Sequence, residues 1–424
     1  LRIAIAGLGT VGIGVVKIVQ KHRDLLEARS GRPIEIVGVS ARTRNRERSA
    51  DISGYAWEDD PVALAQREDV DVFVELIGGD EGPAKDAVEA AIAAGKDVVT
   101  ANKALLAIHG QALAEAAEEK ELCLRFEAAV AGGIPVIKAL TEGLAGNQIT
   151  RVMGVMNGTC NYILTRMQDA GLDYQTVFAE ADALGYLEAD PTLDVGGIDA
   201  GHKLAILAAI AFGTRVDFGA MQIEGIERVS IEDIDLAAEM GYRVKLLGVA
   251  QMTGRGLETR MSPCLVPATS PLGQLEGGTN MVVLEGDSVG QTVLRGAGAG
   301  EGPTASAVMS DVIDIARGIR VPTFGRPATS LAAARAATSA APAPYYLRMA
   351  LADKPGSLAK IATVLGDAGI SIDRMRQLSH TDPSAPVVFV THKTPRAALD
   401  EAIAAMDGTG VLTSAPVALR IEAV

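Results

Sequence analysis

Aromatic residues, cysteines and long apolar runs are all scarce in this sequence. Aromatic residues make up 4% of the 424 residues, with a single tryptophan. No stretch reaches the roughly 18 apolar residues of a membrane-spanning helix, so we expect no membrane partner. Cys123, Cys160 and Cys264 are widely spaced and form no CxxC pair, which argues against a disulfide framework and a zinc knuckle. These absences predict a protein of the reducing cytoplasm.

Positive charge is also in short supply. The chain has 39 Lys and Arg against 53 Asp and Glu, a formal net charge of -14. Such a surface repels a phosphate backbone, so we expect no nucleic-acid partner. A small polar metabolite is the partner that this charge favours.

What the sequence does have is typical of a globular α/β protein. Hydrophobic residues make up 48% and charged residues 22%, and there are 46 glycines. The length exceeds that of one ordinary domain and predicts two or three.

The first part of the chain alternates strands and helices. Residues 2–6, a glycine turn, a long helix and residues 34–41 read as a βαβ opening. Further apolar runs at 70–77, 96–101 and 122–130 are separated by helical patterns. This alternation predicts a Rossmann-type domain over 1–147, with a parallel sheet covered on both faces.

The remaining chain predicts two more folded units. Residues 148–302 read as a mixed α/β catalytic domain, and a helix within 303–326 is expected to rejoin the first domain. Residues 327–344 are rich in Ala, Ser and Pro and are interpreted as a linker. Residues 345–424 read βαββαβ, the ferredoxin-like order.

The motif "GLGTVG" directly follows the first strand and begins a helix. It places Gly7, Gly9 and Gly12 at the GxGxxG spacing of dinucleotide-binding folds. The first glycine permits a tight turn, the second admits a pyrophosphate, and the third lets helix and strand pack closely. We therefore predict a nicotinamide dinucleotide on Gly7 to Gly12, including Leu8, Thr10 and Val11; a turn without ligand is the alternative.

The second strand ends without the acidic residue that would bind the ribose 2′-hydroxyl of NAD. Ser40, Arg42 and Arg44 stand there instead and suit a 2′-phosphate. This favours NADP and leaves NAD as the alternative cofactor; a solvated basic loop is the alternative to either.

A group of charges precedes the apolar run of residues 204–212. It comprises Glu188, Asp190, Asp194, Asp199 and Lys203. Asp199 and Lys203 are four residues apart, so on a helix they share a face, and that face continues into apolar positions that must be buried. The sequence favours a polar cleft in which the lysine donates to a substrate oxygen, with an ordinary i,i+4 ion pair as the alternative.

Two further stretches point to the same cleft. Thr100, Asn102 and Lys103 follow a strand at the sheet edge where ligands of parallel sheets bind. Asn102 could instead cap the next helix, with Lys103 in water. Gly300 belongs to a glycine-rich run before Pro303 that reads as a second cradle for the cofactor or as a flexible joint.

These motifs together resemble the homoserine dehydrogenase family with a C-terminal ACT domain. The resemblance covers nearly all of residues 1–326 and rests on "GLGTVG", "ELIGG", "TANKALLA", "FEAAVAGGIP", "NGTCNYIL", "LGYLEADPTLDVGGIDAGHKLAILA" and "GAGAGEGPTASAVMSD". The ACT part rests on "DKPGSLAKIATVLGDAGISID". The resemblance implies reversible NAD(P)H-dependent reduction of L-aspartate 4-semialdehyde to L-homoserine, in threonine, methionine and isoleucine biosynthesis.

The same resemblance implies roles for individual residues. Lys203 would be the acid/base and Lys103 a second lysine beside substrate and nicotinamide. Glu188 would bind the substrate amine, with Asp194 and Asp199 nearby.

A metal, an effector and an assembly are also implied by the resemblance. A sodium ion would bind at Glu127 and at the carbonyls of Val130, Gly132 and Ile134. The ACT unit would bind an amino acid, with threonine implied, near Gly356, although a plain turn there is an equal alternative. The family further implies a homodimer or homotetramer that dimerises through residues 148–302.

Two other functions are weighed against this one. Cys160 stands where many family sequences have Thr, and as a thiolate nucleophile it would make the protein an acylating semialdehyde dehydrogenase. A small buried hydrophobe is the favoured interpretation of Cys160. The second alternative is a non-catalytic amino acid sensor, which the lysines and carboxylates speak against.

Overall fold

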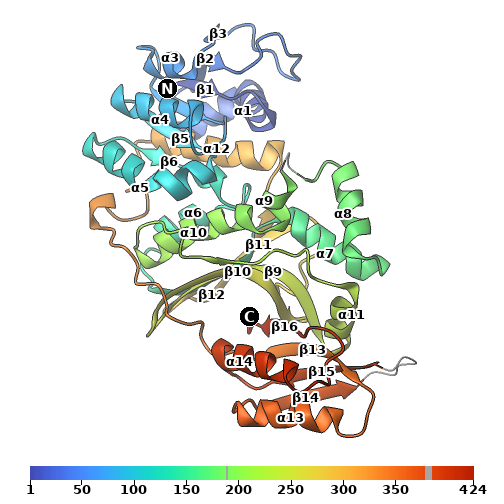
Figure 1. Ribbon diagram of the computed structural model, residues 1–424. Helices are drawn as coiled ribbons and strands as arrows, with labels where there is room; N and C mark the ends of the chain where they lie inside the picture. The colour runs from blue at the N-terminus through green and yellow to red at the C-terminus, as the bar shows by residue number, and fades with distance from the viewer. Residues whose placement is uncertain (188–189, 378–383) are drawn as a thin grey trace.

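The protein is described from a computed structural model that covers residues 1–187, 190–377 and 384–424. Three units follow one another along the chain, from the N-terminal unit at the top of Figure 1 through the central unit to the C-terminal unit at the bottom. No helix among these residues is both long and apolar enough to cross a bilayer.

A six-stranded sheet forms the first unit. Its strands are β1 Arg2–Ala6, β2 Glu35–Ser40, β3 Ala56–Trp57, β4 Val72–Glu75, β5 Asp97–Thr100 and β6 Leu124–Arg125. They are ordered β3-β2-β1-β4-β5-β6 and every pair is parallel. This order and the burial of all four β4 residues confirm the predicted Rossmann-type fold.

Helices cover this sheet, and one of them returns from far along the chain. They are α1 Thr10–Lys21, α2 Arg23–Ser30, α3 Pro61–Gln66, α4 Pro83–Ala93, α5 Lys103–Glu119 and α12 Glu301–Ala316. α12 packs closely on α1, because Gly14 has no side chain: a Cβ there would lie 2.8 Å from the Glu301 carbonyl oxygen. The helix α12 thus lies against the first unit.

The strand expected over residues 122–130 is much shorter. β6 ends at Arg125, and a 3₁₀ turn follows at Glu127–Ala129. The turn is anchored where the Glu127 N–H donates to a carboxylate oxygen of Asp311 on α12, at 2.8 Å. The apolar run is therefore a buried turn rather than a continuous strand, because α12 supplies its hydrogen-bond partner. A short helical stretch, α6 Val136–Lys138 and a π-turn at Ala139–Gly143, leads on to the second unit.

The second unit is a curved sheet packed against helices. Its strands are β7 Ile149–Val155, β8 Gln222–Ile223, β9 Tyr242–Thr253, β10 Gly256–Pro267, β11 Thr279–Gly286 and β12 Gly290–Ala297. Its helices are α7 Gly158–Ala170, α8 Tyr174–Ala183, α9 Pro191–Val195, α10 Ile198–Phe212 and α11 Ile231–Glu239. α10 is buried almost all round, since it lies between this sheet and the first unit.

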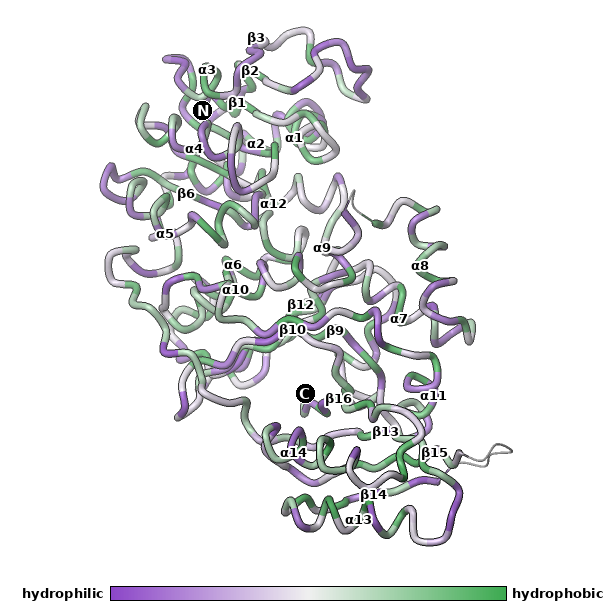
Figure 2. Tube along the Cα trace, in the orientation of Figure 1, coloured by the Kyte–Doolittle hydropathy of each residue, from purple (hydrophilic) through white to green (hydrophobic). Residues whose placement is uncertain are grey.

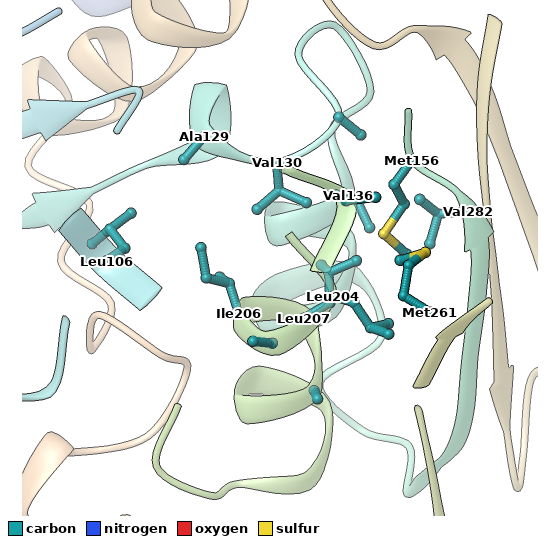
Figure 3. Close-up of a cluster of buried hydrophobic side chains, with 14 of the residues drawn as sticks. Leu106, Ala129, Val130, Val136, Met156, Leu204, Ile206, Leu207, Met261 and Val282 are labelled. Carbon is teal, nitrogen blue, oxygen red and sulfur yellow. The ribbon is translucent and has the colours of Figure 1, made fainter. Parts of the chain in front are cut away.

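The apolar residues of α10 pack into the main hydrophobic core. Figure 3 shows Leu204, Ile206 and Leu207 of α10 within one cluster with Met156 and Met261, among others. Such a close-packed interior resists displacement, so polar groups on α10 are held in fixed positions.

The third unit has the predicted ferredoxin-like order. Its elements are β13 Tyr345–Ala352, α13 Ser357–Asp367, β14 Ile372–Gln377, β15 Ser384–Thr391, α14 Arg396–Asp407 and β16 Val417–Ile421. Its strands lie in the order β16-β13-β15-β14. β16 also pairs with β10 in parallel, so the second and third units share one continuous sheet.

The segment 327–344 connects the first unit to the third and is held along its whole path. A 3₁₀ turn at Ala328–Ser330 begins it. Single bridges then join it to Thr214, Leu257 and Thr394. The predicted linker is therefore an ordered segment that pairs with residues of the second and third units.

Candidate active site

A cavity of about 620 Å³ lies between the first and second units. From the first unit it receives residues that follow β1, β5 and β6, such as Val11, Lys103 and Ala128. From the second unit it receives residues of α7, α9 and α10. The carboxyl ends of parallel strands therefore face the second unit, the position where ligands of such sheets bind.

Two lysines and one carboxylate meet in the wall of this cavity. Asp199 binds Lys203 at 2.7 Å with one oxygen and Lys103 at 2.9 Å with the other. Lys203 also donates to the Met156 carbonyl at 2.8 Å. The Asp199 and Lys203 side chains are each about one-tenth exposed. The predicted helical pair exists, and a lysine from another domain joins it.

The ionisation of Asp199 depends on the two neighbouring lysines. Burial opposes ionisation of Asp199, but the ammonium groups of Lys203 and Lys103 hold the pKa of Asp199 well below its usual value. Because two ammonium groups share one carboxylate, the group formed by Lys103, Lys203 and Asp199 carries a net positive charge. This is an environment that stabilises an oxygen acquiring negative charge.

Asp194 lies on the same side of the cavity. The side-chain amide of Asn157 donates to Asp194 at 2.9 Å and to Asp199 at 3.4 Å. Asn157 also caps α7, because its side-chain oxygen accepts from the Cys160 N–H. Asn157 is not among the residues predicted from the sequence, although an Asn directly before a helix is a recognisable capping signal.

The turn after β5 determines where Lys103 lies. Asn102 caps α5 by accepting from the Leu105 N–H at 3.1 Å, and its amide donates to the Gly79 carbonyl at 2.6 Å. Thr100 is fully buried and donates to Glu75 at 2.5 Å. These two predicted cofactor residues thus shape the turn, and neither side chain lines the cavity. The capping alternative is right for Asn102, but Lys103 is paired with Asp199.

The glycine turn has the shape of a pyrophosphate cradle. A Cβ at Gly7 would lie 2.2 Å from the Leu76 carbonyl, and one at Gly12 would lie 2.0 Å from the Gly7 carbonyl. A Cβ at Gly9, by contrast, would meet nothing within 4 Å. Gly9 precedes α1 without any side-chain cap, so the first N–H groups of α1 are available to an anion. The turn is thus closely packed at Gly7 and Gly12 and open at Gly9, an arrangement that fits a dinucleotide phosphate.

The residues predicted for a 2′-phosphate lie at the end of β2. Ser40 pairs with Ala6 across β1 and β2, and its carbonyl accepts from the Gly7 N–H at 2.8 Å. Arg42 and Arg44 follow in an exposed loop, the hydrophilic segment beside β3 in Figure 2. Arg44 lies over the Trp57 ring, 5.7 Å from its centroid. The basic loop therefore borders the glycine cradle.

The second glycine run also reaches the cavity. Gly300 has a φ of +117°, which only glycine adopts readily, and it precedes α12. Gly298 and Ala299 line the cavity beside it. Because α12 packs on α1, this run lies near the glycine cradle.

The loop suggested for sodium offers carbonyl oxygens. Ala131 and Gly132 have φ values of +55° and +47°, so the backbone reverses sharply here. Among the described residues none donates to the carbonyls of Val130 or Gly132, whereas the Ile134 carbonyl accepts from the Val136 N–H at 2.8 Å. Two unpaired carbonyls in a tight loop fit a hard cation.

Glu127 lies beside that loop and is almost completely buried. Burial and the nearby Asp311 raise the pKa of Glu127 to about 7. Its two oxygens accept from the N–H groups of Ile137 and Lys138, each at 2.9 Å. A carboxylate oxygen has a second lone pair, so these bonds leave capacity for a cation.

Cys160 has none of the properties of a nucleophile. It is fully buried, does not line the cavity, and its thiol donates to the Asp194 carbonyl at 3.3 Å. Burial and the neighbouring carboxylates raise the pKa of Cys160 well above its usual value. A buried neutral thiol speaks against the acylating mechanism and fits the small hydrophobe that we favoured.

The remaining two predicted residues are Glu188 and Gly356. Glu188 falls outside the residues that the structure covers. Gly356 precedes α13 in the third unit with a φ of +87°, and a Cβ there would meet nothing within 4 Å. Glycine is thus required at position 356 by the turn itself.

Family models match the three units. The homoserine dehydrogenase model matches residues 135–313, and the homoserine dehydrogenase NAD-binding domain matches residues 7–127. The ACT domain matches residues 345–408.

Individual relatives match most or all of the chain. A homoserine dehydrogenase of Neisseria gonorrhoeae is 43% identical, covering 100% of this chain and 98% of that protein. The crystal structure of a homoserine dehydrogenase from Thiobacillus denitrificans has a TM-score of 0.94 and 40% identity, with coverage of 100% and 98%. A hyperthermophilic archaeal homoserine dehydrogenase mutant in complex with NADPH has a TM-score of 0.62 and 26% identity, over 74% of this chain and 97% of that one. This chain therefore belongs to the homoserine dehydrogenase family of NAD(P)-dependent oxidoreductases and carries a C-terminal ACT domain.

Proposed function

We propose that the cavity interconverts L-aspartate 4-semialdehyde and L-homoserine, with Lys203 as the acid/base. The observation that carries this proposal is the hydrogen bonding of the Lys203 ammonium. It donates one N–H to Asp199 and one to the Met156 carbonyl. An ammonium has three donors, so the third is available to a substrate oxygen in the cavity.

This geometry indicates how a proton passes between Lys203 and the substrate oxygen. A bound nicotinamide supplies the hydride, which leaves negative charge on the former aldehyde oxygen. The Lys203 ammonium stabilises that charge and transfers a proton to the oxygen, giving the hydroxyl of homoserine. In the opposite direction, neutral Lys203 takes the hydroxyl proton. Asp199 holds the amine in place for both directions.

The other charged groups orient the substrate. Lys103 shares Asp199 with Lys203 and adds positive charge next to the reacting oxygen. Asp194 lines the cavity and suits the substrate ammonium group, together with Glu188 of the same stretch. Carboxylates for the ammonium and lysines for the oxygen fix the substrate at both ends.

NADP is the cofactor that the end of β2 favours. Ser40, Arg42 and Arg44 provide a hydroxyl and two guanidinium groups, and no carboxylate follows the strand before Glu47. Guanidinium groups bind phosphate bidentately. NAD remains the alternative cofactor.

Sodium is proposed at the loop that contains Val130 and Gly132. Their carbonyl oxygens, that of Ile134 and the Glu127 carboxylate would hold it. The loop contributes Ala131 and Gly132 to the cavity wall, so a bound cation would stiffen that wall.

Regulation by an amino acid, with threonine as the expected effector, is proposed for the ACT unit near Gly356. Assembly into a homodimer or homotetramer is proposed with it. β12 and β14 are the two edge strands of the shared sheet, and Val293 and Met375 on them are exposed. Exposed edges with apolar side chains suit contacts between copies of the chain.

One assay tests the reaction. NADPH oxidation is followed with L-aspartate 4-semialdehyde, with and without threonine, and then with NADH. We expect turnover without phosphate or coenzyme A, a preference for NADPH, and inhibition by threonine. A folded protein that binds NADPH but does not oxidise it would refute the proposed reaction and favour the sensor.

A further inference from the structure

Asn280 is a buried residue in the cavity wall whose side-chain oxygen, Oδ1, has no hydrogen-bond partner among the described residues. It is 1% exposed and lies near the start of β11. No described residue donates a hydrogen bond to its Oδ1. Buried amides are nearly always hydrogen-bonded, because leaving one unpaired destabilises the fold. An exception in a ligand cavity indicates that the ligand supplies the partner.

The surroundings of this amide are built from glycine. A Cβ on Gly298 would lie 1.9 Å from Nδ2 of Asn280, and a Cβ on Gly158 would lie 3.5 Å from its Oδ1. Any side chain at position 298 would therefore collide with the amide. The backbone of Asn280 is held as well, since it pairs with Gly296 across β11 and β12. The position of the amide is thus set by the protein before any ligand binds.

Asn280 lies between the two halves of the cavity. On one side, Gly298 leads within three residues to Glu301, whose carbonyl lies against Gly14 of α1 in the dinucleotide domain. On the other side, Gly158 adjoins Asn157, which binds Asp194 and Asp199. The amide therefore stands where the reactive end of a dinucleotide must meet the substrate.

We infer that Asn280 binds the carboxamide of the nicotinamide ring. The Oδ1 of Asn280 accepts from the carboxamide N–H, and its Nδ2 can donate to the carboxamide oxygen. Two amides match each other at both positions, whereas the substrate ammonium has the Asp194 carboxylate as a stronger partner. The contact fixes the rotation of the ring about its glycosidic bond. This inference rests on the proposed use of a nicotinamide cofactor.

Binding measurements with two variants test it. Asn280→Leu removes both polar atoms at nearly constant volume. Asn161→Leu is the matched control, because Asn161 is equally buried but is bonded to Lys245 and Gly277. Titration calorimetry compares NADPH, its 3-acetylpyridine analogue, in which a methyl replaces the carboxamide NH₂, and 2′-phospho-ADP-ribose, which has no nicotinamide ring.

We expect the wild-type protein to bind the acetylpyridine analogue about two- to tenfold more weakly than NADPH, the loss of about one hydrogen bond. In Asn280→Leu that difference should vanish, and the affinity for 2′-phospho-ADP-ribose should stay the same. Undiminished discrimination against the analogue in Asn280→Leu would overturn the inference. So would an equal loss of affinity for all three ligands, or a loss confined to homoserine. Failure of the wild-type chain to bind NADPH would instead count against the proposed function.

Thermal unfolding without ligand gives a second readout. Replacing an unpaired buried amide by leucine removes a destabilising group, so the melting temperature of Asn280→Leu should equal or exceed that of the wild type. Asn161→Leu should melt lower, because it breaks existing hydrogen bonds. A lower melting temperature for Asn280→Leu would mean that the protein itself pairs the amide, and would contradict the inference.

Discussion

Replacing Lys203 by methionine tests the central part of the mechanism. The variant keeps a long apolar chain on the buried face of α10 but removes the donor that faces the substrate oxygen. Loss of one such donor or general acid lowers kcat by about a hundred- to ten-thousandfold, or roughly 3–5 kcal/mol of transition-state stabilisation. NADPH affinity should hardly change, because the cradle at Gly7 to Gly12 is untouched.

The contacts around Lys203 indicate that Lys203→Met should lower the stability of the fold only modestly. Asp199 keeps its ion pair with Lys103, so no carboxylate is left unpaired when Lys203 is removed. The Met156 carbonyl loses a donor, which costs about 1–3 kcal/mol. The variant should therefore fold, with a modest loss in the free energy of unfolding.

Single-turnover oxidation of NADPH is the appropriate assay, because it separates chemistry from product release. Lys245→Met is a matched control, since Lys245 is another buried lysine and does not line the cavity. Its folded fraction should keep most of its kcat. A folded Lys203→Met enzyme with the wild-type single-turnover rate would refute the role of Lys203.

Three further predictions concern the cofactor, Cys160 and pH. Replacing Arg42 and Arg44 together by alanine should weaken NADPH binding about tenfold and leave NADH binding unchanged. If calorimetry showed equal losses of affinity for NADPH and NADH, a contact between these arginines and the 2′-phosphate would be excluded. Cys160→Ala should retain kcat for NADPH oxidation, whereas inactivity in a folded variant would revive the acylating mechanism. Burial lowers the pKa of Lys245 from 10.5 to about 8. The unfolded chain therefore binds more protons between these pH values, so stability should rise with pH there by at most about 3 kcal/mol, relative to Lys245→Met. Denaturant unfolding at several pH values measures this change. The prediction would be contradicted if the free energies of unfolding of the two proteins changed with pH by the same amount across this range.

Several features of the site follow from local sequence patterns. The spacing of Gly7, Gly9 and Gly12 after an apolar strand predicts the βαβ cradle, because the turn requires a positive φ at Gly7 and brings Gly12 against the Gly7 carbonyl. The four-residue spacing of Asp199 and Lys203 likewise predicts a shared helix face. Helical period and turn geometry act over a few residues, so they can be read without the fold.

Other assignments needed the packed molecule. Thr100 was expected to bind the cofactor but donates to Glu75, and the strand expected over 122–130 turns away to reach Asp311 on α12. Both partners lie far away in the sequence. No periodic pattern announces them, because the contact depends on how separate elements pack.

The family, the three units and the lysine on the buried face of α10 could all be predicted from the order of the amino acids. The packed molecule was needed to see that Lys103 shares Asp199 with that lysine and that β16 extends the sheet of the second unit. It was also needed to see that no described residue donates to Oδ1 of Asn280 in the cavity. Side-chain type and helical period are local properties, which is why they can be predicted. The partner of a buried polar group, in contrast, depends on which distant surfaces meet when apolar area is removed from water.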